Sequence, residues 1–284
     1  MNCCIKQGIR YRRPQTINRR YEISTRYRER DFPKLMDTLT AVGGDQLVQS
    51  FRSSCFGQFT DWKPGHKYNM ALHHVISRAI ESDDELLWFY ICGQRVCFTV
   101  TDFALITGLS FGGSTFDTTV EYDVSSVAAY RAFCAPRRAT NIPDLIGRVT
   151  DLQRRVRDED GSLYLRAVLV CVAHTTVCGF DRQVEPWMWA LVDDLVAFNQ
   201  FPWGAYSYKV LRHYTEHCGV GQKYSYYGPA WALYVWAIKK IPNLGGAVGK
   251  AMDMTARPRI LRWGFRIRSL SGDVTRLFEQ TEVF

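Results

Sequence analysis

The sequence lacks the Cys-x-x-Cys pairs that often supply the ligands of structural zinc sites. Its nine cysteines are scattered along the chain, and no Cys-x-x-Cys occurs. A structural zinc ion needs four converging ligands, which are usually supplied as two short pairs. An odd number of scattered cysteines also argues against a disulfide framework. We therefore expect reduced thiols in an intracellular protein, with neither a bound metal nor a cofactor.

An apolar leader and a charge-free membrane span are also missing. Residues 1–20 contain no apolar core of the kind that a secretory signal has. The most apolar run, residues 163–180, is about the minimum length for a span, but it contains Arg166 and His174. Because a charge near the centre of a bilayer is costly, this run predicts a buried core helix and no membrane contact.

Acidic residues are scarce near the N-terminus. Residues 1–30 contain nine Lys/Arg but only two Glu, a net charge of +7 out of +8 for the whole chain. They also lack helical or strand periodicity, which predicts a flexible basic arm. Its arginines alternate with tyrosines, a composition that suits phosphate contacts and base stacking; the alternative is a solvated tail without a partner. The candidate nucleic-acid-binding residues are Arg10, Arg12, Arg13, Arg19, Arg20 and Arg26.

A β-hairpin is predicted at residues 86–99, where two apolar runs flank Gly93-Gln94. A two-residue loop with glycine in its first position suits a type II′ turn, which would pair Phe89 with Phe98. One face of the hairpin then carries only apolar side chains. An isolated hairpin is at best marginally stable in water, so this face should pack on helices.

A short helix should follow the hairpin directly. Thr99 and Asp102 have the spacing of a capping box, and Phe98 and Phe103 stand at the positions of a hydrophobic staple. Gly108 suits a left-handed residue at the helix end. This pattern predicts a helix over residues 100–107.

Elsewhere, apolar residues recur with helical spacing. The predicted helices are 32–42, 45–55, 68–80, 123–134, 141–156, 162–177, 186–198, 207–217 and 231–240, with a turn at 201–204 and a loop over 243–250. We therefore predict a mostly α fold, a single multi-helix domain with a small β-hairpin insertion. The predicted organisation is an arm at 1–30, a helical domain at 31–245 and an Arg-rich C-terminal segment at 246–284.

Four ordered motifs resemble those of a known family. They are Ser-Cys-Phe-Gly at 54–57, Leu-Trp-Phe at 87–89, the capped helix with its end at 102–109, and Phe-Pro-Trp-Gly-x-x-Ser-Tyr at 201–208. Over residues 46–245 the chain resembles DUF1985, a plant domain of unknown function. The resemblance implies a transposon-derived gene and no known catalytic residue. Members of that family often precede a SUMO-type, ubiquitin-like-protein-specific cysteine protease domain, which we do not find here.

Two pairs of possible metal ligands have the i, i+4 spacing that places side chains on one helix face. They are His213 with His217, and His174 with Cys178. Each pair supplies only two ligands, and the pairs lie far apart in sequence. A cysteine nucleophile would need a histidine base and an oxyanion-hole segment, which we do not recognise. We therefore predict that the chain is not an enzyme.

Aromatic residues are dense at 201–208 and 224–236, and they permit two interpretations. Exposed aromatics beside Lys209, Arg212, Lys223 and Lys239 would form a stacking platform for single-stranded nucleic acid. The aromatics of the second segment, however, have helical spacing among Ala and Leu, which favours a core.

The sequence therefore leads to three functional hypotheses. The first is a non-enzymatic interaction module with an unidentified protein partner, in a transposon-associated plant protein. The second is a nucleic-acid-binding protein that acts through the basic arm, which also resembles a nuclear-import patch. The third is an accessory part of a SUMO-protease system.

Overall fold

Helices dominate the computed structural model, which describes residues 23–25, 28, 31–63, 69–81, 86–134, 141–154, 156–159, 161–217, 224–265 and 276–278. Eleven α-helices and seven short strands lie within these residues, which confirms the predicted mostly α class with a small hairpin. None of the described helices is both long and apolar enough to cross a bilayer.

The chain divides into two compact units that are interleaved in sequence. Unit 1 comprises residues 1–26, 64–108 and 207–284, and unit 2 comprises residues 27–63 and 109–206. The predicted division into consecutive segments at 1–30, 31–245 and 246–284 stays a prediction.

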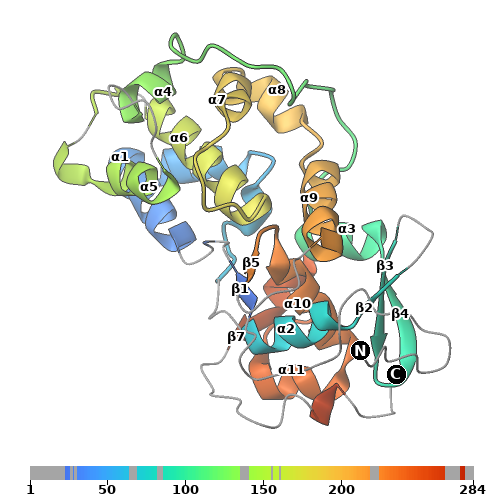
Figure 1. Ribbon diagram of the computed structural model, residues 1–284. Helices are drawn as coiled ribbons and strands as arrows, with labels where there is room; N and C mark the ends of the chain where they lie inside the picture. Colours follow the sequence, from blue (N-terminus) through green and yellow to red (C-terminus); the bar gives the residue numbers. More distant parts are fainter. Residues whose placement is uncertain are drawn as a thin grey trace. The chain divides into compact units, whose positions relative to one another are not determined.

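Unit 1 combines helices with three small sheets (Figure 1). Its helices are α2 (Asn69–Ser77), α3 (Val100–Thr107), most of α9 (Trp203–His217), α10 (Ala230–Lys240), α11 (Pro242–Val248) and the 3-10 helix η5 (Arg259–Arg262). Its strands are β1 (Ile23–Thr25), β2 (Ala79–Ile80), β3 (Leu87–Ile91), β4 (Gln94–Phe98), β5 (Tyr224–Tyr226), β6 (Gly249–Ala251) and β7 (Trp263–Phe265).

The predicted hairpin is present, but its turn lies one residue earlier than expected. Leu87 pairs with Phe98 and Phe89 with Val96, so the predicted pairing of Phe89 with Phe98 is wrong. Cys92 and Gly93 occupy the turn with φ of 50° and 78°. Two positive φ values are those of a type I′ turn, not a type II′ turn. Because the pairing shifts by two residues, side chains keep their predicted faces, and Leu87, Phe89 and Phe98 are buried.

A third strand extends this hairpin. The predicted helix over 68–80 ends at Ser77, and Ala79 and Ile80 instead form β2, which pairs antiparallel with β3. Apolar spacing alone does not separate the last turn of a buried helix from a short buried strand, which explains the error.

Helix α3 forms as predicted over residues 100–107. The Thr99 hydroxyl accepts from the Asp102 N–H at 3.0 Å, and the Asp102 carboxylate accepts from the Thr99 N–H at 3.3 Å. Gly108 ends the helix in the left-handed region with φ of 69°. The rings of Phe98 and Phe103 are in T-shaped contact at 6.3 Å, which confirms the hydrophobic staple.

The core of unit 1 forms where the apolar hairpin face meets α10. Trp236 is fully buried, and its ring lies 5.2 Å from Phe89 and 5.5 Å from Phe98. Tyr208 of α9 stacks on Phe98 and donates its hydroxyl to the Phe98 carbonyl at 3.3 Å. Helix α10 also packs against α2 and α3 (Figure 1). The hairpin therefore obtains the helical cover that its apolar face requires.

Two irregular segments predicted for unit 1 are regular instead. The expected loop at 243–250 is largely α11, begun by Pro242, and Gly245 packs where an added Cβ would lie 2.9 Å from Trp263. Close packing, not flexibility, therefore explains glycine there. Part of the predicted arm is also ordered, because Ile23–Thr25 pair in parallel with β5. Three residues are too few for a strand period to show in sequence.

Unit 2 is helical. Its helices are α1 (Phe32–Arg52), α4 (Ala128–Phe133), α5 (Ile142–Thr150), α6 (Ser162–Val172), α7 (Pro186–Asp193) and α8 (Leu195–Gln200), with 3-10 turns η2 (Gly57–Phe59) and η3 (Leu152–Arg154) and a π turn η4 (Ala173–Val177). The predicted central helix over 162–177 is α6 with η4, and it is buried along most of its length. Helices α1, α4, α5 and α7 all pack against α6 (Figure 1).

Polar side chains set several boundaries in unit 2 that apolar spacing did not predict. Asp194 divides the predicted helix over 186–198, because its carboxylate accepts from Val196 N–H at 2.9 Å and begins α8. The predicted cap at Asn141 is confirmed, but α5 ends at Thr150 instead of 156.

Helix α4 begins only at Ala128, five residues after the predicted start at 123. The predicted turn at 201–204 is also wrong, since Trp203 already begins α9 after Pro202.

Helix α1 combines two predicted helices. It runs from Phe32 to Arg52, but Gly43 and Gly44 within it have non-helical backbone angles. Gly44 has a φ of 58°, which glycine adopts without the strain of a Cβ. The predicted break between 42 and 45 is therefore present as a kink.

Replacing Phe98 with Ala should lower the free energy of unfolding by about 3–5 kcal/mol, the usual range for a buried Phe. The substitution removes the contacts with Phe103, Tyr208 and Trp236 at once. Leu105→Ala is the matched control, because Leu105 lies on the adjoining helix and is 45% exposed. Denaturant unfolding measures both, and equal losses would contradict the assigned core.

Candidate functional site

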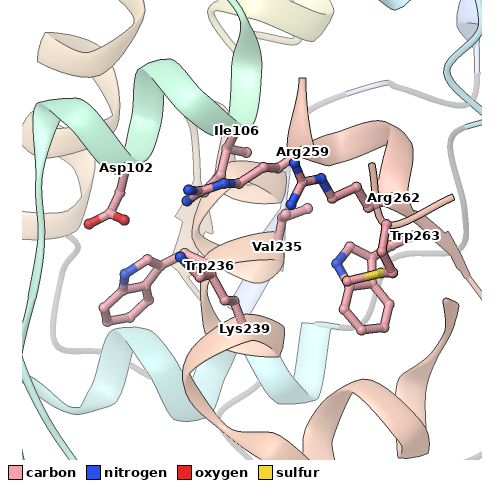
Figure 2. A pocket seen from close by; sticks show the side chains of 9 residues that line it. Asp102, Ile106, Val235, Trp236, Lys239, Arg259, Arg262 and Trp263 are labelled. Atoms are coloured by element: carbon pink, nitrogen blue, oxygen red, sulfur yellow. The ribbon is translucent and has the colours of Figure 1, made fainter. Parts of the chain in front are cut away.

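A small pocket in unit 1 is lined by three cationic side chains, one carboxylate and several apolar groups (Figure 2). Its volume is about 90 Å³. The lining residues come from α3, α10 and the segment from Met254 to Trp263, namely Asp102, Ile106, Val235, Trp236, Lys239, Met254, Arg259, Arg262 and Trp263. Segments more than a hundred residues apart in sequence therefore meet at this site.

Lys240, Arg259 and Arg262 lie close enough to Lys239 to act on its charge, and we call Lys239, Lys240, Arg259 and Arg262 the cationic cluster. Burial lowers the pKa of the Lys239 ammonium, and repulsion from Arg259 lowers it further, while Asp102 acts in the opposite direction. Across the part of the chain that the structure describes, no carboxylate lies within ion-pair distance of any of the four. The cluster therefore has an excess of positive charge.

The single carboxylate of the pocket is already engaged. Asp102 belongs to the capping box of α3, where its Oδ2 accepts from both the N–H and the hydroxyl of Thr99. Arg262 is also held in place, because its Nε donates to the Ala256 carbonyl at 2.8 Å. Lys239 and Arg259 make no such contact in the described chain, and Figure 2 shows their side chains extending toward the end of the pocket where Asp102 and Trp236 lie.

The indole of Trp236 forms the inner wall at one end of the pocket. Its Nε1–H is buried and has no hydrogen-bond acceptor among the described residues. Figure 2 shows the indole nitrogen on the side of the ring toward Asp102. A buried N–H without an acceptor costs free energy, so this donor is a cost of the core packing. The donors of the pocket itself are the charged side chains of Lys239, Arg259 and Arg262.

The residues that the sequence singled out lie elsewhere. Candidate arm residues Arg10, Arg12, Arg13, Arg19, Arg20 and Arg26 all lie outside the described residues. His213 and His217 stack at 4.6 Å on α9, and the His217 ring contacts the His213 carbonyl at 2.9 Å. No group of three or more possible metal ligands occurs within the described ranges.

His174 and Cys178 belong to no group of three or more possible metal ligands among the described residues. The Nε2 of His174 lies 3.1 Å from the carbonyl of Arg182, so that nitrogen donates a hydrogen bond. Burial lowers the pKa of His174 to about 4, and burial raises the pKa of Cys178. Both groups are therefore neutral and packed in the core of unit 2.

Four of the six described cysteines, namely Cys55, Cys92, Cys171 and Cys178, are poor nucleophiles. Burial raises the pKa of Cys55 to about 12, and it also raises the pKa values of Cys92 and Cys171. A thiol with a raised pKa forms little of the reactive thiolate near neutral pH. None of the six described cysteines forms a disulfide.

The aromatic residues of segments 201–208 and 224–236 are mostly core, as their helical spacing favoured. Trp203, Tyr226 and Trp236 are each at most 1% exposed. They cannot offer open faces for base stacking, so the stacking-platform interpretation is wrong for these side chains.

A family model described as a domain of unknown function, DUF1985, matches residues 76–213. The chain contains a DUF1985 domain. The match includes the hairpin, α3 and the motif at 201–208, as predicted, but it is shorter than the predicted range of 46–245 and leaves out the motif at 54–57. No curated protein and no solved structure gives a match.

The DUF1985 match covers only part of the pocket. Asp102 and Ile106 lie inside it, whereas Trp236, Lys239 and the η5 arginines follow it in sequence. Sequence reasoning missed the pocket, although it noted the Arg-rich C-terminal segment at 246–284 that contributes Arg259 and Arg262. The signal was the presence of arginines between apolar residues, Ile260, Leu261 and Trp263, which anchors their backbone against the core.

His174 should make the free energy of unfolding fall as the pH drops from about 6.5 to about 4. The folded protein holds this ring neutral down to a pKa of about 4, against 6.5 when unfolded, so in that window the unfolded chain binds the extra proton. The contribution, fully present above pH 6.5, amounts to about 3 kcal/mol. His174→Gln should give a shallower pH dependence in urea unfolding, and an unchanged slope would contradict the neutral buried ring.

Proposed function

We propose that this DUF1985-containing chain is a non-enzymatic interaction module that binds an anionic group of a partner at the cationic cluster of unit 1. The observation that carries the proposal is the excess positive charge of Lys239, Lys240, Arg259 and Arg262, which have no carboxylate in ion-pair distance among the described residues. Like charges held together raise each other's energy, and a bound anion lowers it.

A non-enzymatic role is supported by the state of the possible catalytic groups. Burial raises the pKa values of Cys55, Cys92, Cys171 and Cys178, and it lowers the pKa of His74 to about 3 and that of His174 to about 4. Groups that are inert near neutral pH do not suit general acid–base or nucleophilic catalysis, for which pKa values are tuned toward the working pH.

The second candidate function is sequence-independent nucleic-acid binding through the basic arm. Its support is the charge distribution, because residues 1–30 carry a net charge of +7 and alternate arginine with tyrosine. Such segments neutralise phosphates and release counterions. The accessory role in a SUMO-protease system has no support from the described residues and stays a prediction.

The double variant Lys239→Ala/Arg259→Ala should lower the affinity for an anionic probe about tenfold or more, because charge-assisted hydrogen bonds are lost. Fluorescence anisotropy with a labelled ten-residue polyglutamate peptide and with a random-sequence DNA duplex measures this at several salt concentrations. The matched control is Lys250→Ala/Arg257→Ala, which removes the same charge from two exposed residues that belong neither to the cationic cluster nor to the pocket lining. Equal losses in the two double variants for both probes, or no binding of either at low salt, would refute the proposed function.

Nucleic-acid binding through the arm should have a log–log salt slope of about −4 to −5 on duplex DNA, which corresponds to roughly four to six phosphate contacts. Substituting alanine for Arg10, Arg12, Arg13, Arg19 and Arg20 should flatten the slope to about −1 or less. Substitution is preferable to deleting residues 1–30, because Ile23–Thr25 form β1.

The charge control for the arm removes five exposed cations from the body of the chain. They are Lys34, Lys63, Arg182, Lys209 and Lys250. This variant should keep a steep slope in the same anisotropy titration. If the arm variant and the body variant bind duplex alike, the arm has no special role and is a solvated tail.

A further inference from the structure

We propose that the pocket receives the carboxylate of an acidic side chain from a partner protein segment in which apolar residues flank the acidic one. This inference rests on the proposed function and names the chemistry of the partner. It uses three features of the site: its size, its donors and the apolar side chains around it.

The size of the pocket restricts its occupant. Its volume of about 90 Å³ is well below the roughly 300–1,000 Å³ of sites that enclose drug-sized ligands or cofactors. A single anionic group with a short stem fits, while a whole nucleotide or a cofactor does not. The occupant is therefore one side chain of a larger partner.

The donors match a carboxylate. Arg259 and Lys239 line the pocket and provide charged N–H groups without a partner in the described chain. A carboxylate has two oxygens with about four lone-pair positions and accepts from several donors at once. Asp102 faces the same pocket, but the Thr99 N–H and hydroxyl already donate to its Oδ2. The three cations that line the pocket outweigh it.

The surroundings of the pocket are apolar. All large hydrophobic side chains that are exposed among the described residues of unit 1 lie on α3 or between β6 and η5; they are Val100, Leu105, Met252 and Met254. Met254 lines the pocket, and the N–H of Met252 donates to the Arg262 carbonyl at 2.8 Å. Leu105 lies three residues after Asp102, so both project from neighbouring positions of α3. We call Leu105, Met252 and Met254 the apolar rim.

An apolar rim favours a peptide over a nucleic acid. Phosphates in a nucleic-acid backbone are flanked by hydrophilic sugars, which gain nothing from contact with two methionines and a leucine. Base stacking needs an open aromatic face, but Trp236 is fully buried. Methionine side chains adapt to varied apolar partners and are common at peptide-binding surfaces. An acidic residue between apolar ones therefore complements both the charge and the rim.

The test is selection from a phage-displayed library of random twelve-residue peptides against the full chain. Enriched peptides should carry Asp or Glu within two positions of Leu, Ile, Met or Phe. A synthetic peptide from this set should lose affinity about tenfold when its acidic residue becomes Gln or Asn, because a charge-assisted contact is removed. Enrichment without acidic residues, or no enrichment at all, would overturn the inference.

A double-mutant cycle locates the contact. Arg259→Ala should weaken binding of the acidic peptide about tenfold. It should leave binding of the amide peptide, in which Gln or Asn replaces the acidic residue, nearly unchanged, since the two changes remove the same interaction. Arg257→Ala is the matched control, because Arg257 is exposed, lies two residues away and does not line the pocket. Additive effects of Arg259→Ala and the peptide change, or equal effects of the two arginine variants, would place the carboxylate elsewhere.

The same measurements separate this inference from the proposed function. If duplex DNA or inorganic phosphate binds with dependence on Arg259 while acidic peptides do not, the cationic cluster binds anions and the peptide inference fails. If no anionic probe depends on Arg259 or Lys239, both fail together.

Discussion

Trp236 is the residue on which unit 1 most depends. One side of its ring packs against Phe89 and Phe98, which join the hairpin to helix α10. Its Nε1–H is buried and has no hydrogen-bond acceptor among the described residues. Burial of a large indole supplies much of the apolar contact that a small sheet needs, and the cost is one unsatisfied donor. Core packing and the candidate site are therefore built from the same side chain.

The position of the pocket follows from this packing. Because α10 is fixed against the hairpin, Lys239 lies three residues beyond Trp236, almost one helical turn away. The capping box fixes the start of α3 and with it Asp102. The η5 segment then brings Arg259 and Arg262 against α3 and α10, with Ile260 buried beneath them. Like charges gather there because apolar neighbours hold their backbone, and an anionic partner would offset the resulting repulsion.

The errors in the element predictions have a common cause. Local signals were reliable where one residue and its near neighbours determine the geometry, as at Thr99, Asp102, Gly108 and Asn141. These signals failed where contacts with segments distant in sequence determine the local structure. Ile23–Thr25 become a strand only because β5 lies beside them, and Gly245 belongs to a helix because Trp263 packs closely on it. The hairpin turn was predicted one residue too late, which shifts the strand pairing by two residues. Each side chain keeps its predicted face because side-chain direction repeats every two residues.

The sequence by itself determined the mostly helical class, the capped helix at 100–107, the buried run at 162–177 and the presence of a DUF1985 domain. The helices depend on side-chain patterns within about twenty residues, and the family depends on the order of short motifs along the chain, so tertiary contacts are not needed to recognise either. Only the tertiary structure decided the pairing of β1 with β5, the division into two interleaved units and the pocket. The pocket joins Asp102 to Arg259 across more than 150 residues. Sequence spacing contains no signal for such a meeting, because the burial of Trp236 and its neighbours brings those segments together.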